Sequence, residues 1–322
     1  MRSGQLTGTR RLSLGRPKCA CTQRFGNRVH GPRLNSLSLS GTSASQPVSS
    51  PRGVLILPGL GNNAQDYQHL AKLLHQRGLT VSIAPVARPD WSRNAAALTD
   101  LAWWQGQLKP RPAVDWYLTK VDSAMQQLKR AVHGAPITML SHSAGGWLGR
   151  VYLKEFGTAG VDRFVSLGSP HQAPPTGVMD QTRGILTWVN AASPDNFHPE
   201  VSYTTIAGKF IKGVDPLRGD GPPLAKFAGA GYSQVCGRAD VWGDVIVPLP
   251  CAHLGGGTTN LDLEGVFHSP LGENLPFFGA WYGSEQVLPR WVHHLDGSSP
   301  DVAEAEAEAE KGRERVVAVQ EL

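Results

Sequence analysis

The chain has 322 residues, 40% of them hydrophobic, which suffices for one large α/β domain or two small ones with a sizeable core. Its net charge of +5 arises in residues 1–52, which hold nine arginines and lysines and no acid. The rest of the chain therefore has a net charge of −4. This mildly acidic body argues against a nucleic-acid partner, and no apolar run reaches the roughly 18 residues that a transmembrane helix needs.

Residues 1–50 are rich in Arg, Ser, Gly and Leu, and the first acid of the chain is Asp66. They contain no apolar stretch of secretory-signal length, so their composition indicates an organellar transit peptide, with a disordered basic arm as the alternative. The serine content favours the chloroplast, and the mitochondrion is the second choice. We expect a globular domain over residues 51–298 and an acidic, low-complexity tail of Ala-Glu repeats over residues 299–322.

The first half of the domain predicts a parallel sheet. Residues 53–57 have the pattern of a buried strand, residues 64–77 that of a helix ending at Gly78, and residues 80–84 that of a second strand. Such a βαβ unit implies parallel strands. An irregular aromatic stretch over 85–112 follows, and apolar residues at spacings of three and four then predict a long helix over 114–132.

The clearest motif surrounds Ser143. Residues 137–140 predict a buried strand and residues 147–156 a helix, with the serine at the apex of the turn between them. In Gly-x-Ser-x-Gly turns the backbone is strained and its neighbours must be small, as the three residues after Ser143 are. Ser141 stands where that pattern has its first glycine. The arrangement indicates a nucleophile at the carboxyl edge of an α/β sheet.

The second half continues the sheet. Residues 164–167, 203–207 and 245–247 predict strands, and residues 286–295 predict a final helix. Residues 170–200 read as a loop that is too long and too apolar for an ordinary connection. We expect them to form a lid over an acyl pocket, together with residues 91–104.

A serine hydroxyl becomes a good nucleophile only when a base takes its proton. On α/β-hydrolase sheets the order along the chain is serine, acid, histidine. After Ser143 the chain offers Asp244 and then His268, both at expected strand-end turns. Asp240 is the rival acid, although pairing with Arg238 explains it more simply.

An oxyanion hole requires two backbone N–H groups aimed at the developing charge. Ala144, directly after the nucleophile, predicts one of them, and Leu60 in the glycine loop after the first strand predicts the other. A plain tight turn is the alternative interpretation of that loop. A phosphate site fits less well, because Gly59 and Gly61 lack the third glycine of a dinucleotide fingerprint and no Walker lysine follows.

The remaining histidines and cysteines predict no metal site. We expect His142 to point away from the nucleophile and His171 to lie near the site, and we expect packing or surface roles for the other histidines considered (His253, His293 and His294). No metal-binding spacing occurs, so neither a metal nor another cofactor is expected. Four cysteines are too few for a disulfide framework, and Cys236 and Cys251 read as reduced thiols, with a regulatory disulfide as the alternative.

Several stretches together resemble a family of plant and algal plastid α/β-hydrolases that are lipase-like and similar to the hydrolase domain of GPI inositol-deacylases. These are the serine turn, Leu57–Asn62, Arg111–Leu118, Gly231–Asp244 and Gly265–Pro270. The resemblance covers about residues 51–296. It implies an α/β-hydrolase fold, with a mostly parallel central sheet, helices on both faces and a loop-rich cap. It also implies Ser143, Asp244 and His268 as the triad, with Ser141 and Val245 departing from the family's usual glycines.

The predicted function is therefore hydrolysis of carboxylic esters, with a small-molecule or lipid ester as substrate. Acyl transfer in the same site is the second enzymatic alternative. A non-catalytic lipid-binding or scaffold protein that keeps the fold is the third. Peripheral contact with a membrane stays open.

Overall fold

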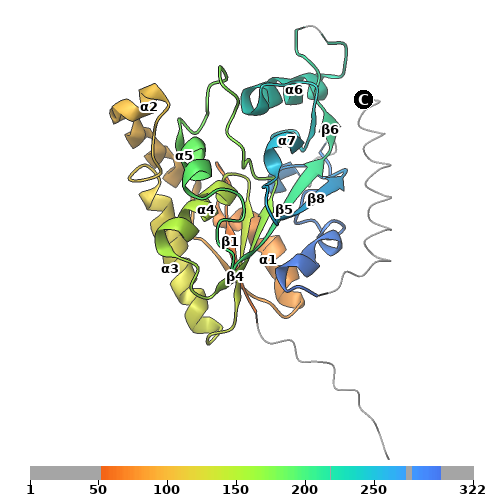
Figure 1. Ribbon diagram of the computed structural model, residues 1–322. Coiled ribbons are helices and arrows are strands. Elements are labelled where there is room, and N and C mark those ends of the chain that lie inside the picture. The colour runs from red at the N-terminus through yellow and green to blue at the C-terminus, as the bar shows by residue number, and fades with distance from the viewer. Residues whose placement is uncertain (1–51, 218, 273–277, 299–322) are drawn as a thin grey trace, which may run out of the picture. The chain divides into compact units, whose positions relative to one another are not determined.

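The computed structural model describes residues 52–217, 219–272 and 278–298 (Figure 1). The expected leader over residues 1–50 and the expected tail over residues 299–322 lie outside the described residues. Within the described part, no helix is both long enough and apolar enough to cross a membrane.

A six-stranded parallel sheet forms the centre, in the order β2-β1-β3-β4-β5-β8. Its strands are β1 Gly53–Leu57, β2 Thr80–Ile83, β3 Ile137–His142, β4 Val161–Leu167, β5 Ser202–Lys209 and β8 Thr259–Glu264. β1 and β3 are buried along their whole length because helices cover both of their faces. A short antiparallel pair, β6 Ile211–Lys212 with β7 Trp242–Gly243, follows β5.

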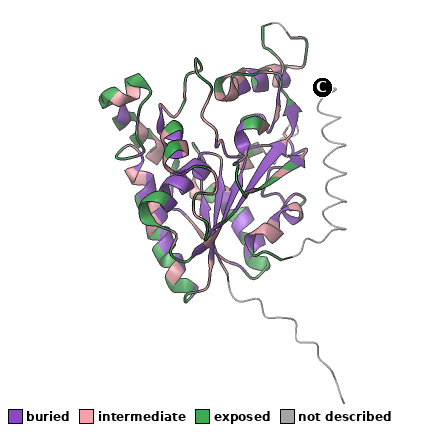
Figure 2. Ribbon diagram, viewed as in Figure 1, coloured by how far each residue is buried: buried purple, intermediate pink, exposed green. Residues whose placement is uncertain are grey.

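Helices cover the two faces of the sheet, which lies buried between them (Figures 1 and 2). One apolar core contains side chains of β1 and β3 and of three helices, α3 Asp115–Ala131, α4 Ala144–Phe156 and α5 Ile185–Ala192. The core on the other face contains α1 Gln68–Gln76 and the C-terminal residues up to Leu295. Such an arrangement is the α/β-hydrolase fold that the sequence predicts.

Several shorter elements complete the fold. The 3₁₀ helices are η1 Ala64–Tyr67, η2 Arg88–Thr99, η3 Pro270–Gly272, η4 Leu288–Arg290 and η5 Val292–Leu295, and the remaining α-helices are α2 Leu101–Gln105, α6 Pro223–Cys236 and α7 Leu249–Ala252. α6 packs on β6, and α7 packs on β5. Both lie next to the segment that carries Asp244, because Tyr232 of α6 contacts Val245 and α7 begins at Leu249.

Four expectations about local structure were wrong. The predicted final helix over 286–295 is two 3₁₀ turns, η4 and η5, and the predicted strand over 245–247 is a turn. The stretch 85–112 contains η2 and α2, and the stretch 170–200 contains α5. The strands β6, β7 and β8 and the helices α6 and α7 were not predicted at all.

Candidate active site

The turn between β3 and α4 places Ser143 at the carboxyl edge of the sheet. Ser143 has φ 52° and ψ −128°, a backbone conformation that L-residues rarely adopt. The neighbours are small because the backbone approaches closely: a Cβ on Gly59 would lie 2.7 Å from that of Ser143, and one on Gly145 would lie 2.5 Å from the Leu57 carbonyl oxygen. Ser141 is fully buried, and its hydroxyl donates to the Val165 carbonyl (3.1 Å), so it does more than fill space.

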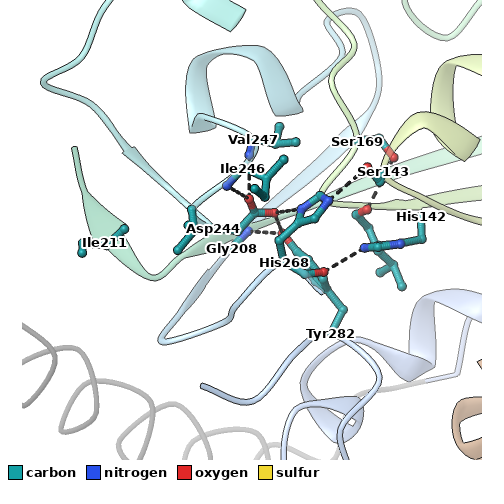
Figure 3. Close-up of polar contacts among 12 residues, drawn as sticks. His142, Ser143, Ser169, Gly208, Ile211, Asp244, Ile246, Val247, His268 and Tyr282 are labelled. Atoms are coloured by element: carbon teal, nitrogen blue, oxygen red, sulfur yellow. Dashed lines mark hydrogen bonds and ion pairs between the residues drawn. The ribbon is translucent and has the colours of Figure 1, made fainter. Parts of the chain in front are cut away.

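The structure brings Ser143, His268 and Asp244 together (Figure 3). His268 Nε2 lies 3.0 Å from the Ser143 hydroxyl oxygen, and His268 Nδ1 lies 2.7 Å from Asp244 Oδ2. Asp244 is fully buried and His268 is 7% exposed. Because a carboxylate can only accept, Nδ1 carries the proton and Nε2 is the acceptor for the serine hydroxyl. The chain order is the one expected from the sequence.

A tight turn holds the Asp244 carboxylate. Its Oδ1 accepts hydrogen bonds from the backbone N–H groups of Ile246 (3.1 Å) and Val247 (2.7 Å). Residues 245–247 do not form a strand because the carboxylate takes these donors. Val245 has φ 88°, which is the conformation that glycine adopts easily, and its N–H donates to the Tyr232 hydroxyl (2.9 Å). The turn after Asp244 therefore forms with a valine at position 245.

Tyr282 is a residue of the candidate site that the sequence analysis missed. Its hydroxyl donates to Asp244 Oδ2 (2.7 Å) and accepts from the Gly208 N–H (2.7 Å) (Figure 3). Burial, together with the adjacent Asp244 carboxylate, raises the pKa of Tyr282 well above its ordinary value, so the hydroxyl keeps its proton and remains a donor. No sequence motif marks it, because the contact joins residues 38 positions apart.

Asp240, the rival acid, lies away from this network. Its side chain is 70% exposed and lies 3.3 Å from the Arg238 guanidinium. Among the described residues, Asp244 alone provides a buried carboxylate that accepts a hydrogen bond from His268. The geometry thus assigns Asp240 the ion-pairing position and Asp244 the position behind the histidine.

His142 links the two sides of the site. Its Nε2 lies 2.9 Å from the His268 carbonyl oxygen and its Nδ1 lies 2.7 Å from the Tyr67 hydroxyl, which accepts from the Gly59 N–H (3.0 Å). Since a carbonyl can only accept, His142 is protonated on Nε2, and Tyr67 donates to its Nδ1. Burial lowers the pKa of His142 well below its usual value, which keeps the ring neutral.

Two backbone N–H groups stand where an oxyanion hole is expected. Ala144 begins α4, and the first N–H groups of a helix have no partner within it. The Leu60 N–H makes no hydrogen bond to the described residues. Leu60 directly follows Gly59, whose backbone lies against Ser143, so both candidate N–H groups border the nucleophile.

A cavity of about 250 Å³ opens beside Ser143. Its walls come from both segments that were expected to form a lid, residues 91–104 and 170–200, together with α3 and α4. Aromatic rings dominate it, in particular those of Trp91, Trp103, Trp116, Tyr117 and Trp147. A pocket of this kind accepts an apolar group next to the reacting carbonyl.

The other candidates have structural positions. His171 is buried with its Nε2 2.8 Å from the Ser166 hydroxyl, and burial lowers its pKa well below the usual value. Cys236 and Cys251 are free thiols, and burial beside Cys236 raises the pKa of Cys251 to about 12. No cluster of metal-ligating side chains occurs among the residues that the structure describes.

Comparisons with known proteins give the following. No family model and no curated protein matches the sequence. Among solved structures, the mature lipase BlEst2 of Bacillus licheniformis is 16% identical with a TM-score of 0.44, and the match covers 72% of this chain and 90% of that one. Its propeptide form is 16% identical with a TM-score of 0.47, and the match covers 79% of this chain but only 52% of that one.

Phospholipase PlaB from Legionella pneumophila is 10% identical with a TM-score of 0.47, and the match covers 84% of this chain and 63% of that one. Likenesses this weak carry no argument about function, so we derive function from this chain's own residues. The resemblance to plastid hydrolases and GPI inositol-deacylases stays a prediction.

Proposed function

We propose that the chain is a serine hydrolase that cleaves carboxylic esters, lipid acyl esters in particular, through a covalent acyl-enzyme. The observation that carries the proposal is the continuous contact from the Ser143 hydroxyl through His268 to the buried Asp244, at 3.0 Å and 2.7 Å. Nucleophile, base and orienting acid in this order of contact are what acyl transfer requires.

In the first half of the reaction, Ser143 Oγ attacks the ester carbonyl carbon while His268 Nε2 takes the hydroxyl proton. The N–H groups of Leu60 and Ala144 hold the negative oxygen that develops. The tetrahedral intermediate then expels the alcohol, which receives its proton from His268. Asp244 stays ionised throughout and stabilises the imidazolium.

In the second half, water attacks the acyl-enzyme and gives a proton to His268, which returns it to Ser143 as the carboxylic acid leaves. The Asp244 carboxylate accepts hydrogen bonds from Ile246, Val247 and Tyr282. These bonds fix its orientation, so the catalytic histidine keeps one tautomer.

A fluorophosphonate probe tests the proposal, because only an activated serine reacts with it. We expect the wild-type protein to be labelled and to hydrolyse p-nitrophenyl esters, and Ser143→Ala to do neither. Product analysis in the presence of added alcohols separates hydrolysis from acyl transfer. A folded wild-type protein that neither reacts with the probe nor hydrolyses any ester would instead favour a non-catalytic role.

The composition of residues 1–50 supports a location in the chloroplast. Import into isolated chloroplasts and mitochondria, compared for the full chain and for a chain starting near Pro51, tests this part of the proposal. Uptake by mitochondria alone would contradict it.

A further inference from the structure

Arg183 stands out in the wall of the cavity beside Ser143. Among the described residues that line this cavity, it is the one with a charged side chain. The other described residues of the wall are aromatic, aliphatic or neutral and polar, and none of them is an acid. A single cation in a largely apolar wall has few groups to interact with until a ligand arrives.

No carboxylate among the described residues forms an ion pair with this cation. None of the ion pairs within 4.0 Å in the described part of the chain involves Arg183, and its guanidinium donates no hydrogen bond there. The nearest acid in sequence, Asp180, is engaged elsewhere: its Oδ1 accepts from the Thr182 N–H (2.7 Å) and its Oδ2 from the Gly184 N–H (3.0 Å). The donors of Arg183 are therefore available.

The surroundings fix the position of the guanidinium. Its Cζ lies 3.9 Å from the centroid of the Trp103 ring, which also lines the cavity. Arg183 has φ 57°, a left-handed conformation that is uncommon for a side chain of this size, and the Asp180 carboxylate closes the turn that imposes it. Stacking leaves the edge of the guanidinium free, and that edge matches the two oxygens of a carboxylate.

We propose that the cavity binds an ester whose acyl part ends in a carboxylate, with Arg183 as the residue that recognises the anion. The proposal rests on the proposed function and deepens it, since it names the substrate class of the same site. The volume of about 250 Å³ limits the acyl part. At roughly 30 Å³ for each water-sized group, the cavity holds about eight such groups, which corresponds to a chain of medium length.

The test uses pairs of p-nitrophenyl esters that are matched in chain length. One member is the ester of a neutral acid (butyrate, hexanoate or octanoate), and the other is the half-ester of the dicarboxylic acid with the same number of carbons (succinate, adipate or suberate). For the wild-type protein we expect kcat/KM for the best half-ester to exceed that of its neutral partner by about tenfold or more. Salt should reduce this ratio, because screening weakens the contact of opposite charges.

Arg183→Gln should lower the half-ester to neutral-ester ratio by about tenfold or more, and Arg183→Lys should restore part of it. Arg238→Gln is the matched control: it removes the same charge from an exposed position paired with Asp240, and should leave the ratio unchanged. Binding of the half-ester to Ser143→Ala, measured by calorimetry, provides a readout without turnover, and this binding should weaken when Arg183→Gln is added.

The outcomes separate the two proposals. Neutral esters hydrolysed with a ratio that Arg183→Gln does not change would overturn the role of Arg183 and leave the serine hydrolase intact. A ratio that falls equally in Arg183→Gln and Arg238→Gln would also overturn it, because net charge alone would then explain the preference. Absence of both ester hydrolysis and probe labelling would refute the serine hydrolase and, with it, this inference.

Discussion

Replacing Asp244 by asparagine should abolish most activity by changing the tautomer of His268. Two backbone N–H groups point at Oδ1 of Asp244, at 3.1 Å and 2.7 Å, and these donors cannot reverse. The amide oxygen of an asparagine must therefore occupy the Oδ1 position, which places its NH₂ group against His268 Nδ1. Since NH₂ only donates here, Nδ1 must become the acceptor, so Nε2 carries the proton and cannot take that of Ser143.

The size of the expected fall in kcat follows from the change of tautomer. In the serine-protease template a wrong tautomer lowers kcat by about 10⁴, and we expect kcat of Asp244→Asn to fall by between ~10² and ~10⁴. Asp240→Asn is the matched control. Its side chain is 70% exposed, so we expect kcat to stay close to wild type and stability to change by about 0.5 kcal/mol or less.

Steady-state kinetics on a soluble ester, together with thermal melts, check both Asp variants. A folded and active Asp244→Asn would refute the assignment of the acid, and it would do so most directly beside an inactive Asp240→Asn. A pH-independent loss of labelling by the fluorophosphonate probe in Asp244→Asn would support the tautomer argument, because the serine would then lack an acceptor for its proton.

Three further predictions concern the nucleophile, Tyr67 and the buried histidines. Ser143→Ala should lower kcat by at least ~10⁴. Ser141→Ala should remain active and lose about 0.5–1.5 kcal/mol of stability, because it removes one buried hydrogen bond. Labelling by the probe that survives only in Ser143→Ala would reverse the assignment of the nucleophile. Tyr67→Phe leaves the buried Gly59 N–H and His142 Nδ1 without partners, so it should lower stability by about 1–3 kcal/mol and slow labelling by the probe. An unchanged melting temperature would contradict the contribution of these two hydrogen bonds. Because burial keeps the folded-state pKa of His142 and His171 below the unfolded value of about 6.5, stability should be full above about pH 6.5 and fall below it, by up to about 2.7 kcal/mol per pH unit for the two rings. Urea unfolding between about pH 5 and 7 measures this slope, and a flat profile would show that these rings are not buried neutral.

Sequence alone could predict the strands that are buried on both faces, because β1 is an apolar run and the first four residues of β3 include three large apolar side chains. β8 escaped prediction since it is an edge strand: of its residues Thr259–Glu264 only Leu263 is buried, so no apolar run marks it. α6 is rich in alanine and glycine over Pro223–Cys236, which weakens the helical pattern. The C-terminal residues 286–295 look amphipathic, yet they form 3₁₀ turns around Pro289 rather than one helix.

The residues of the candidate site also differ in whether the sequence predicts them. Ser143, Asp244 and His268 could be proposed because their order along the chain follows a rule of the fold. Tyr282 and Tyr67 could not, since each acts through a hydroxyl that meets a partner distant in sequence. The turn after Asp244 was misread as a strand because Val-Ile-Val has high strand propensity, and only the structure shows that the carboxylate takes its N–H groups.

Part of the cavity wall lies on segments of the chain that carry no triad residue, and this has a consequence for how the protein can change over evolutionary time. Nearly half of the lining residues come from two excursions, residues 85–112 between β2 and α3 and residues 170–200 between β4 and β5, neither of which contributes a strand to the sheet. Ser143 and His268 follow strands of the sheet itself, and Asp244 follows β7. Substitutions and length changes in the excursions can therefore retune what is bound while the chemistry stays the same, so relatives of this chain should share its reaction more widely than its choice of acyl group.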